Sequence, residues 1–179
     1  MSSGMLSPSH SATEAYSSPA QQRLNQVSSH LGGKKGSSIT EKHPDDIVVT
    51  CALRTALTKG GKGGFKDTAA ADMLAGVFKA VIDRSGIDPK LVDDISVGSV
   101  LAPGGGATEF RAAALVAGFP ETTSVKSLNR QCSSGLQAIV DIANAIKSGM
   151  IDVGIGAGVE SMSLQYGYVI FFPRHLPHR

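Results

Sequence analysis

Short apolar runs alternate with helical patterns along this chain, and that alternation constrains its fold more than any other feature. Four runs predict buried strands: Asp46–Leu53, Asp94–Val100, Ser124–Leu128 and Val153–Ala157. Three stretches with apolar residues at helical spacing predict helices between them: Ala71–Arg84, Thr108–Ala117 and Ser133–Ser148. Asp67 or Thr68 is expected to cap the first helix, and Gly86 is expected to end it. The order βαβαβαβ predicts an α/β domain with a mainly parallel, mixed sheet.

The third predicted helix begins at a cysteine that directly follows the third predicted strand, in the stretch NRQCSSG around Cys132. A lone cysteine at such a place is more often an inert buried residue. However, unpaired N–H groups and the positive end of the helix dipole favour a thiolate there. Small residues after it, Ser133 to Gly135, allow a ligand to approach the backbone closely. Cys132 is therefore a candidate nucleophile, whereas Cys51 is expected to serve packing alone.

Several long stretches, in this order, carry a family resemblance: ALRTALTKGGKGGFKDT, DISVGSVLAPGGGATEFRAA, GFPETTSVKSLNRQCSSG, LQAIVDIANAIKSG and DVGIGAGVESMS. From about Asp45 to Ser163 the sequence resembles the N-terminal half of a thiolase, in particular the peroxisomal 3-ketoacyl-CoA thiolases. The resemblance implies a five-layered fold built from two packed halves. This chain would carry an incomplete first half, with the helix after the nucleophile lying centrally in the complete fold.

The resemblance also implies an activity. Thiolases are acyltransferases that cleave 3-ketoacyl-CoA with coenzyme A, giving acetyl-CoA and a shortened acyl-CoA in fatty acid β-oxidation, through an acyl-thioester on a cysteine that matches Cys132. It implies coenzyme A as a substrate, no further cofactor, and a homodimer. The Gly- and Lys-rich loop Arg54–Asp67 lacks the spacing of a phosphate-binding loop, so a CoA contact by Lys59 or Lys62 stays open.

The positions of the histidines decide what the chain can do alone. None of the five, at positions 10, 30, 43, 175 and 178, lies between Asp45 and Ser163. In the family, an activating histidine and a second cysteine come from the C-terminal half. The chain by itself is therefore expected to be inactive or nearly so. Glu160 is expected to belong to a polar network rather than to act as the base.

Other functions stay open beside this one. The alternative to an enzyme is a non-enzymatic fragment that associates with full-length thiolase subunits. A β-ketoacyl synthase also uses a cysteine at a helix start, but the NRQ and GVESMS stretches resemble a thiolase. A papain-like hydrolase would need a histidine partner within the fold.

The two ends of the chain differ from its middle. Residues 1–43 are poor in large apolar side chains and are expected to form a disordered arm. Within it, the pairs Arg23-Leu24 and His30-Leu31 have a spacing similar to the N-terminal peroxisomal targeting signal of this family. That similarity implies an import receptor as a partner and a peroxisomal location. Residues 44–163 are expected to form the partial thiolase domain, and 164–179 a tail unlike the family that results from truncation.

Charge, cysteine count and hydropathy argue against nucleic-acid-binding, disulfide-rich, metal-binding and membrane-spanning proteins. A net charge of +2 gives no argument for a nucleic-acid partner. The two cysteines are far apart and have no metal-ligand spacing, so neither a disulfide framework nor a metal site is expected. No apolar run approaches the roughly 20 residues that a membrane span requires.

Overall fold

The computed structural model describes residues 18, 24, 41–44 and 46–165. The chain divides into two compact units, Met1–Pro44 and Asp45–Arg179, and every helix and strand bounded below belongs to the second. In chain order these elements are α2 (Ala70–Ser85), η1 (Pro89–Leu91), β1 (Asp94–Gly98), η2 (Pro103–Gly105), α3 (Ala107–Ala117), β2 (Ser124–Leu128), α4 (Ser134–Lys147) and β3 (Gly154–Gly158).

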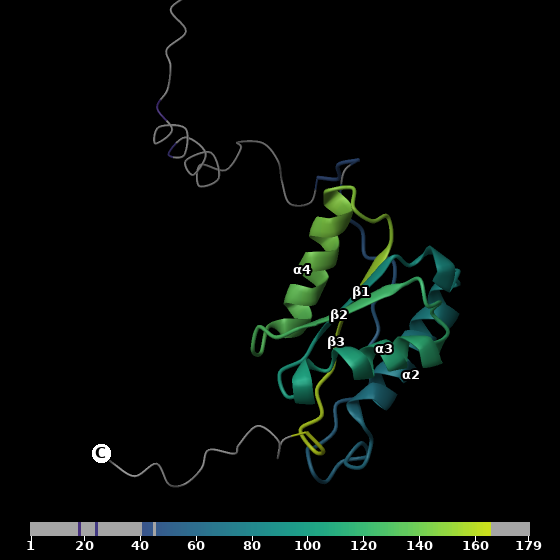
Figure 1. Cartoon of the computed structure of the whole chain (residues 1–179), viewed down its shortest axis with the longest axis vertical. Helices are drawn as coiled ribbons and strands as arrows, with labels where there is room; N and C mark the ends of the chain where they lie inside the picture. The colour runs from purple at the N-terminus through teal and green to yellow at the C-terminus, as the bar shows by residue number, and fades with distance from the viewer. Residues whose placement is uncertain (1–17, 19–23, 25–40, 45, 166–179) are drawn as a thin grey trace, which may run out of the picture. The chain divides into compact units, whose positions relative to one another are not determined.

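The three strands form one parallel sheet in the order β2-β1-β3, with helices on both faces (Figure 1). Asp94 at the start of β1 pairs with Ser124 on one side and Gly154 on the other, so all three strands run in register. Parallel strands require crossover connections, which α3 and α4 provide. The predicted α/β class is confirmed, and these strands and helices lie within one or two residues of the predicted bounds.

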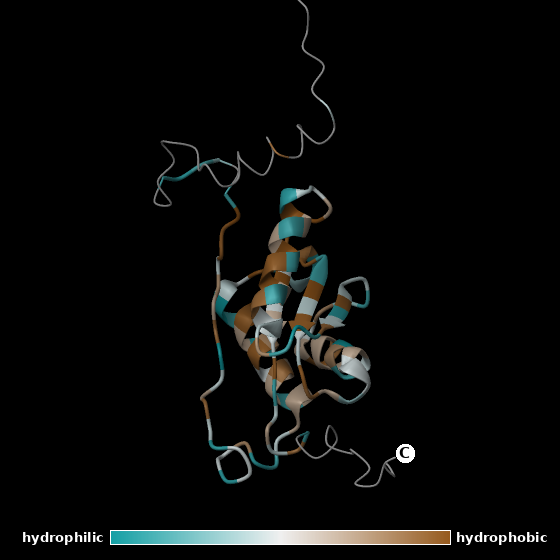
Figure 2. Ribbon diagram, turned by 90° about the vertical axis from the view of Figure 1, so that its left-hand side faces the viewer, coloured by the Kyte–Doolittle hydropathy of each residue, from teal (hydrophilic) through white to brown (hydrophobic). Residues whose placement is uncertain are grey.

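The hydrophobic core lies between the sheet and the pair α2 and α3. Ile95 and Val97 of β1 are fully buried there, against Leu74 and Phe78 of α2 and Phe110 of α3. Because successive strand residues point to opposite faces, Ser96 and Gly98 of β1 face the other way. That second face is covered by α4, along which apolar and polar residues alternate (Figure 2).

Glycines on the second face let α4 lie directly on the sheet. A Cβ atom added to Gly156 of β3 would come within 2.5 Å of the Ile139 Cα atom of α4. One added to Gly98 would collide with the Ser134 backbone at the start of α4. Side chains at these positions would force the helix away from the sheet. The glycines therefore fix the position of the first turn of α4.

The predicted first strand, Asp46–Leu53, is wrong. These residues form no strand, and Val48 and Val49 are 73% and 75% exposed. A β-branched run indicates a preference, but a strand also needs a neighbouring strand to receive its backbone hydrogen bonds. No described strand pairs with this segment, because β3 is bonded only to β1 within the described residues.

The sequence predicted the C-terminal end of α2 correctly but not its N-terminal cap. The cap prediction for Asp67 or Thr68 is wrong, because the N-cap is Ala69 and no side chain caps it. Asp67 instead pairs with Lys66. Gly86 ends the helix as predicted, with φ of 67° and its N–H donating to the Ile82 carbonyl. Among the helices described, none is both long and apolar enough to cross a membrane.

Candidate active site

Cys132 lies in the short connection between the end of β2 and the start of α4. Its side chain is exposed and forms no disulfide. The sulfur therefore lies at the carboxyl end of a parallel sheet, open to approach by a ligand, which is where such sheets bind their ligands. Cys51 is partly buried in the extended segment before α2.

The residue before Cys132 has an unusual backbone. Gln131 has φ of 52°, and it is the one non-glycine residue with positive φ among those described. This left-handed conformation costs a residue with a Cβ atom about 1–2 kcal/mol. Strain of this kind persists where the surroundings hold it, and it clusters at functional sites.

Two side chains hold the Gln131 turn from both sides. The Gln131 N–H donates to Asn129 Oδ1 at 2.9 Å. The Gln131 carbonyl accepts a hydrogen bond from Ser134 Oγ at 2.5 Å, and Ser134 Oγ in turn accepts from the Arg130 N–H at 2.8 Å. Ser134 is only 3% exposed, so its hydroxyl is fixed in place. The backbone that carries Cys132 is thus fixed before the helix begins.

The first N–H groups of α4 are arranged differently from the sequence-based expectation. The N–H groups of Ser133 and Ser134 donate to the carbonyls of Arg130 and Gln131, so the turn itself uses them. Within the described residues, the Cys132 N–H donates no hydrogen bond. That group remains able to bind an oxyanion that forms on a substrate next to the sulfur.

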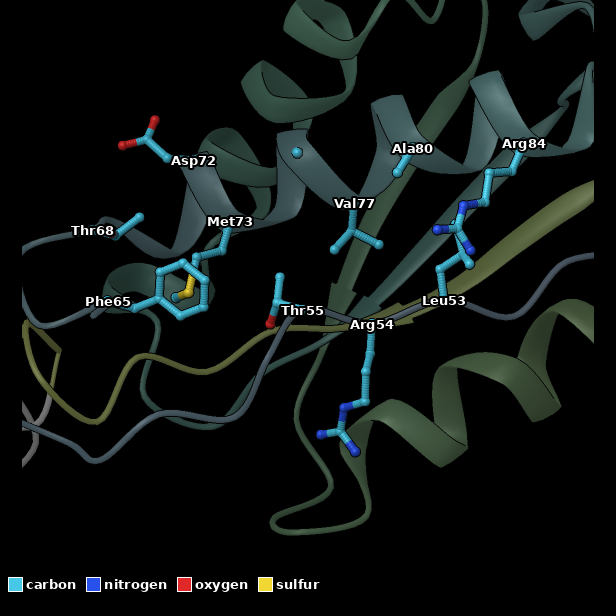
Figure 3. Close-up of a pocket in the computed structure, with 11 residues that line it drawn as sticks. Leu53, Arg54, Thr55, Phe65, Thr68, Asp72, Met73, Val77, Ala80 and Arg84 are labelled. Atoms are coloured by element: carbon cyan, nitrogen blue, oxygen red, sulfur yellow. The ribbon is translucent and has the colours of Figure 1, made fainter. Parts of the chain in front are cut away.

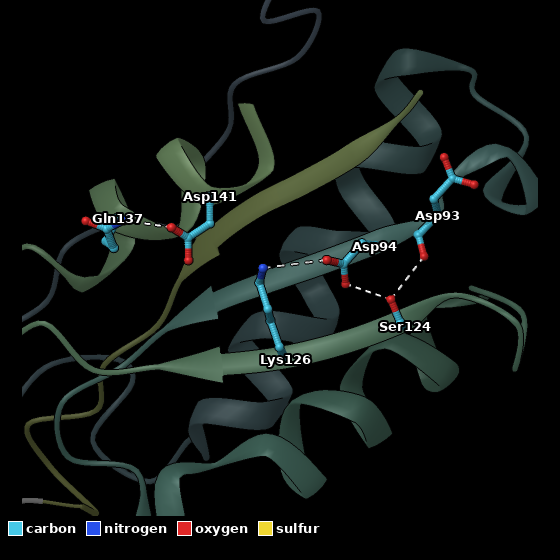
Figure 4. A network of polar contacts seen from close by, with 6 residues as sticks. All are labelled: Asp93, Asp94, Ser124, Lys126, Gln137 and Asp141. Atoms are coloured by element: carbon cyan, nitrogen blue, oxygen red, sulfur yellow. Dashed lines mark hydrogen bonds and ion pairs between the residues drawn. The ribbon is translucent and has the colours of Figure 1, made fainter. Parts of the chain in front are cut away.

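Polar side chains near the site have structural partners. Gln137 Nε2 of α4 donates to Asp141 Oδ1 at 2.7 Å (Figure 4). Arg130 donates a hydrogen bond to Gln137. At the opposite end of the strands, Lys126 and Asp94 form an ion pair across β2 and β1. Glu160, just after β3, accepts hydrogen bonds from the loop that follows β1, as expected of a polar-network residue.

A cavity of about 390 Å³ opens elsewhere, along α2, and Cys132 does not line it. Its walls include Leu53, Phe65, Met73 and Val77, with Arg54 pointing away from α2 (Figure 3). Neither Lys59 nor Lys62 lines this cavity.

The described part of the second compact unit, residues 46–165, contains no histidine that could act as a general base for Cys132. Among all the described residues the one histidine, His43, belongs to the first compact unit. In this part of the chain no three His, Cys, Asp or Glu side chains gather as a metal site requires. Of the predicted targeting residues, Leu24 is helical and exposed, whereas Arg23, His30 and Leu31 lie outside the described residues.

Comparison with known proteins identifies the family. The model of the thiolase N-terminal domain matches residues 47–171, which is more than half of the chain and extends past Ser163. The chain belongs to the thiolase family. This confirms the resemblance seen in the sequence. The part of the match beyond residue 165 lies outside the described residues.

Relatives of this thiolase chain are much longer than it is. The peroxisomal 3-ketoacyl-CoA thiolase of Yarrowia lipolytica is 57% identical over 148 residues, covering 81% of this chain and 36% of the relative. The peroxisomal 3-ketoacyl-CoA thiolase 5 of Arabidopsis thaliana is 56% identical over 123 residues, covering 68% of this chain and 27% of the relative. The chain thus spans about a third of the length of these relatives.

Solved structures agree with the fold. The dimeric peroxisomal thiolase of Saccharomyces cerevisiae superposes with a TM-score of 0.68 at 46% identity, over 71% of this chain and 33% of that one. The Bacillus anthracis acetyl-CoA acetyltransferase gives a TM-score of 0.61 at 33% identity, over 74% of this chain and 34% of that one. The strands and helices described here are therefore those of part of a thiolase.

Sequence reasoning did not find the residues that shape the turn. The sequence assigned no role to Asn129, it assigned Ser134 only a small size that admits a ligand, and it did not indicate the strain at Gln131. Asn and Ser side chains often bond to backbone groups two or three residues away. That tendency was the available indication, because both residues lie within three positions of Cys132.

Proposed function

We propose that this thiolase chain contributes the acyl-carrying cysteine, Cys132, to the thiolytic cleavage of 3-ketoacyl-CoA in peroxisomal fatty acid β-oxidation. The observation that carries the proposal is the exposed sulfur of Cys132 on a rigid turn between β2 and α4, within a chain of this family. The names of its relatives, which are peroxisomal 3-ketoacyl-CoA thiolases, support the substrate class.

The chemistry assigned to Cys132 has two steps. Its thiolate attacks the 3-keto carbonyl carbon, the bond between carbons 2 and 3 breaks, and the acetyl-CoA carbanion leaves and takes up a proton. The acyl group is then a thioester on Cys132, and the thiolate of a second coenzyme A displaces it and frees the cysteine. In both steps the carbonyl oxygen becomes an oxyanion, for which the Cys132 N–H is one donor.

The proton transfers need a group that the described residues do not supply beside Cys132. A base must remove the thiol proton, and an acid must protonate the departing carbanion. We therefore infer that the purified 179-residue chain does not cleave acetoacetyl-CoA with coenzyme A at a measurable rate. Loss of one member of a cooperative catalytic set typically lowers turnover by several orders of magnitude.

A half-reaction tests the nucleophile separately from turnover. Incubation with acetyl-CoA should transfer an acetyl group to Cys132 and release coenzyme A, because attack on a thioester needs only the thiolate. Peptide mass spectrometry should find the acetyl group on Cys132, and the Cys132→Ser variant should lose the label. Cys51→Ser is the matched control and should keep it. Equal labelling of both cysteines, or none, would contradict the proposal.

Association with other thiolase chains is the second part of the proposal. Three apolar side chains of α4 are exposed in this structure, Leu136 at 64%, Ile139 at 48% and Val140 at 40%. Exposed apolar residues grouped on one helix favour association. The yeast relative is dimeric, which supports a homodimer or pairing with longer thiolase subunits. In such an assembly this chain could also act as a non-enzymatic subunit.

A peroxisomal location is the third part. The targeting residues Arg23, Leu24, His30 and Leu31 are proposed to belong to a short amphipathic helix that binds the import receptor. The peroxisomal names of several relatives support this location.

A further inference from the structure

The Glu160 carboxylate ties the end of β3 to the loop after β1. Glu160 follows β3 by two residues, and its Oε1 atom accepts from the Leu101 N–H at 2.9 Å and from Ser99 Oγ at 3.2 Å. Its Oε2 atom accepts from the Val100 N–H at 2.9 Å. Three donors converge on one carboxylate, and hydrogen bonds to a charged acceptor are about twice as strong as neutral ones.

These bonds continue toward the nucleophile. The peptide group whose N–H belongs to Leu101 presents the Val100 carbonyl on its other side, and that oxygen accepts from Asn129 Nδ2 at 3.2 Å. The other end of the Asn129 amide, Oδ1, accepts from the Gln131 N–H at 2.9 Å. An unbroken series of hydrogen bonds therefore runs from the Glu160 carboxylate to the strained residue before Cys132.

We propose that Glu160 is a positioning residue for Cys132, acting through the Val100–Leu101 peptide and Asn129 on the Gln131 turn. This inference rests on the proposed role of Cys132 as the nucleophile. Glu160 touches neither the sulfur nor any reacting atom. It fixes the loop after β1, which fixes the Asn129 amide, which in turn keeps Gln131 in its left-handed conformation and sets the direction of the Cys132 side chain.

Close packing makes this arrangement sensitive to small shifts. Gly98, immediately before the loop that Glu160 holds, lies against the Ser134 backbone at the start of α4. The Cβ atom of a residue at Gly158 would come within 3.0 Å of the Gly135 Cα atom. A shift of the loop after β1 therefore displaces both the turn before Cys132 and the start of α4 after it.

A double-mutant cycle on the full chain tests the proposal, with Glu160→Gln, Asn129→Ala and the double variant. Glutamine keeps the size of the side chain but replaces one acceptor oxygen by an NH₂ group facing a donor. The measured quantities are the rate of Cys132 acetylation by acetyl-CoA, its rate of alkylation by iodoacetamide across pH, and the free energy of unfolding. We expect each single variant to slow acetylation by about tenfold, since small misplacements of a reacting group have effects of this size or larger.

Coupling between the two sites is the decisive readout. Because both residues act through one series of bonds, the double variant should be no slower than the slower single variant. Glu121, an exposed residue before β2, provides the matched control Glu121→Gln. Its effect on the acetylation rate should multiply with that of Asn129→Ala. Two results would overturn the positioning role. One is a decrease in the Cys132 acetylation rate that follows the decrease in the free energy of unfolding. The other is a double variant whose rate decrease is the product of the two single decreases.

The same data separate this inference from the proposed function. If the unsubstituted chain is not acetylated at Cys132, the proposed nucleophile fails, and the alkylation rates still show whether Glu160 and Asn129 act together. If Cys132 is acetylated and Glu160→Gln leaves both its rates unchanged, only the positioning role is wrong.

Discussion

A single strained residue, Gln131, determines how the Cys132 sulfur is presented. Its φ of 52° is one that glycine adopts freely and that β-branched residues strongly avoid. Gln131→Gly should therefore stabilise the chain or leave it unchanged, whereas Gln131→Val should lower the free energy of unfolding by about 1–2 kcal/mol or more. Urea denaturation measures both, and Gln131→Ala controls for loss of the side chain.

The Gln131→Gly substitution should lower the reactivity of Cys132 even though it does not lower the stability of the fold. With glycine at position 131 the turn gains conformational freedom, so acetylation of Cys132 should slow even though the fold is not weakened. A Gln131→Val variant as stable as the original chain would show that the left-handed conformation is not maintained in solution.

At the scale of elements, the contact between α4 and the sheet depends on glycines of β1 and β3. Gly156→Ala should lower the free energy of unfolding by about 1–3 kcal/mol or more, because the added methyl group meets the Ile139 backbone. Gly76→Ala in α2 is the matched control, since nothing lies within 4 Å of its added Cβ atom. That change should raise stability by about 0.5–1 kcal/mol. Thermal or urea unfolding of both variants checks the pair, and equal effects would contradict the close packing.

Most elements could be predicted from the sequence because local patterns and tertiary packing agree there. The apolar residues of α2, α3 and α4 recur at helical spacing, and glycines follow α2 and α3 at their observed ends. Prediction failed at Asp46–Leu53, where strand formation depends on a neighbouring strand rather than on the segment itself. The position of Cys132 followed from the strand-to-helix junction. The contacts of Glu160 with Val100 and of Asn129 with the Val100 carbonyl did not, because they join residues whose proximity only the folded sheet creates.

At the scale of the whole molecule, two compact units divide the proposed roles: the second carries Cys132 and the first carries the proposed targeting residues. The reactivity of Cys132 and the import of the protein should therefore depend on different parts of the chain. Changes in the first unit should move the protein within the cell without altering the reactivity of Cys132. Changes around Cys132 should leave import unaffected.

The import prediction tests this separation directly. A fluorescent reporter fused behind residues 1–44 should enter peroxisomes. Replacing Arg23 and His30 by alanine should leave the reporter in the cytosol, because these two side chains supply the polar contacts expected of the signal. Replacing His10 and His43 is the matched control, since both are histidines outside the spaced pairs, and import should persist. In the full-length chain, the Arg23 and His30 substitutions should leave the acetylation rate of Cys132 unchanged. Import that survives the loss of Arg23 and His30 would show that the spaced pairs are not a targeting signal.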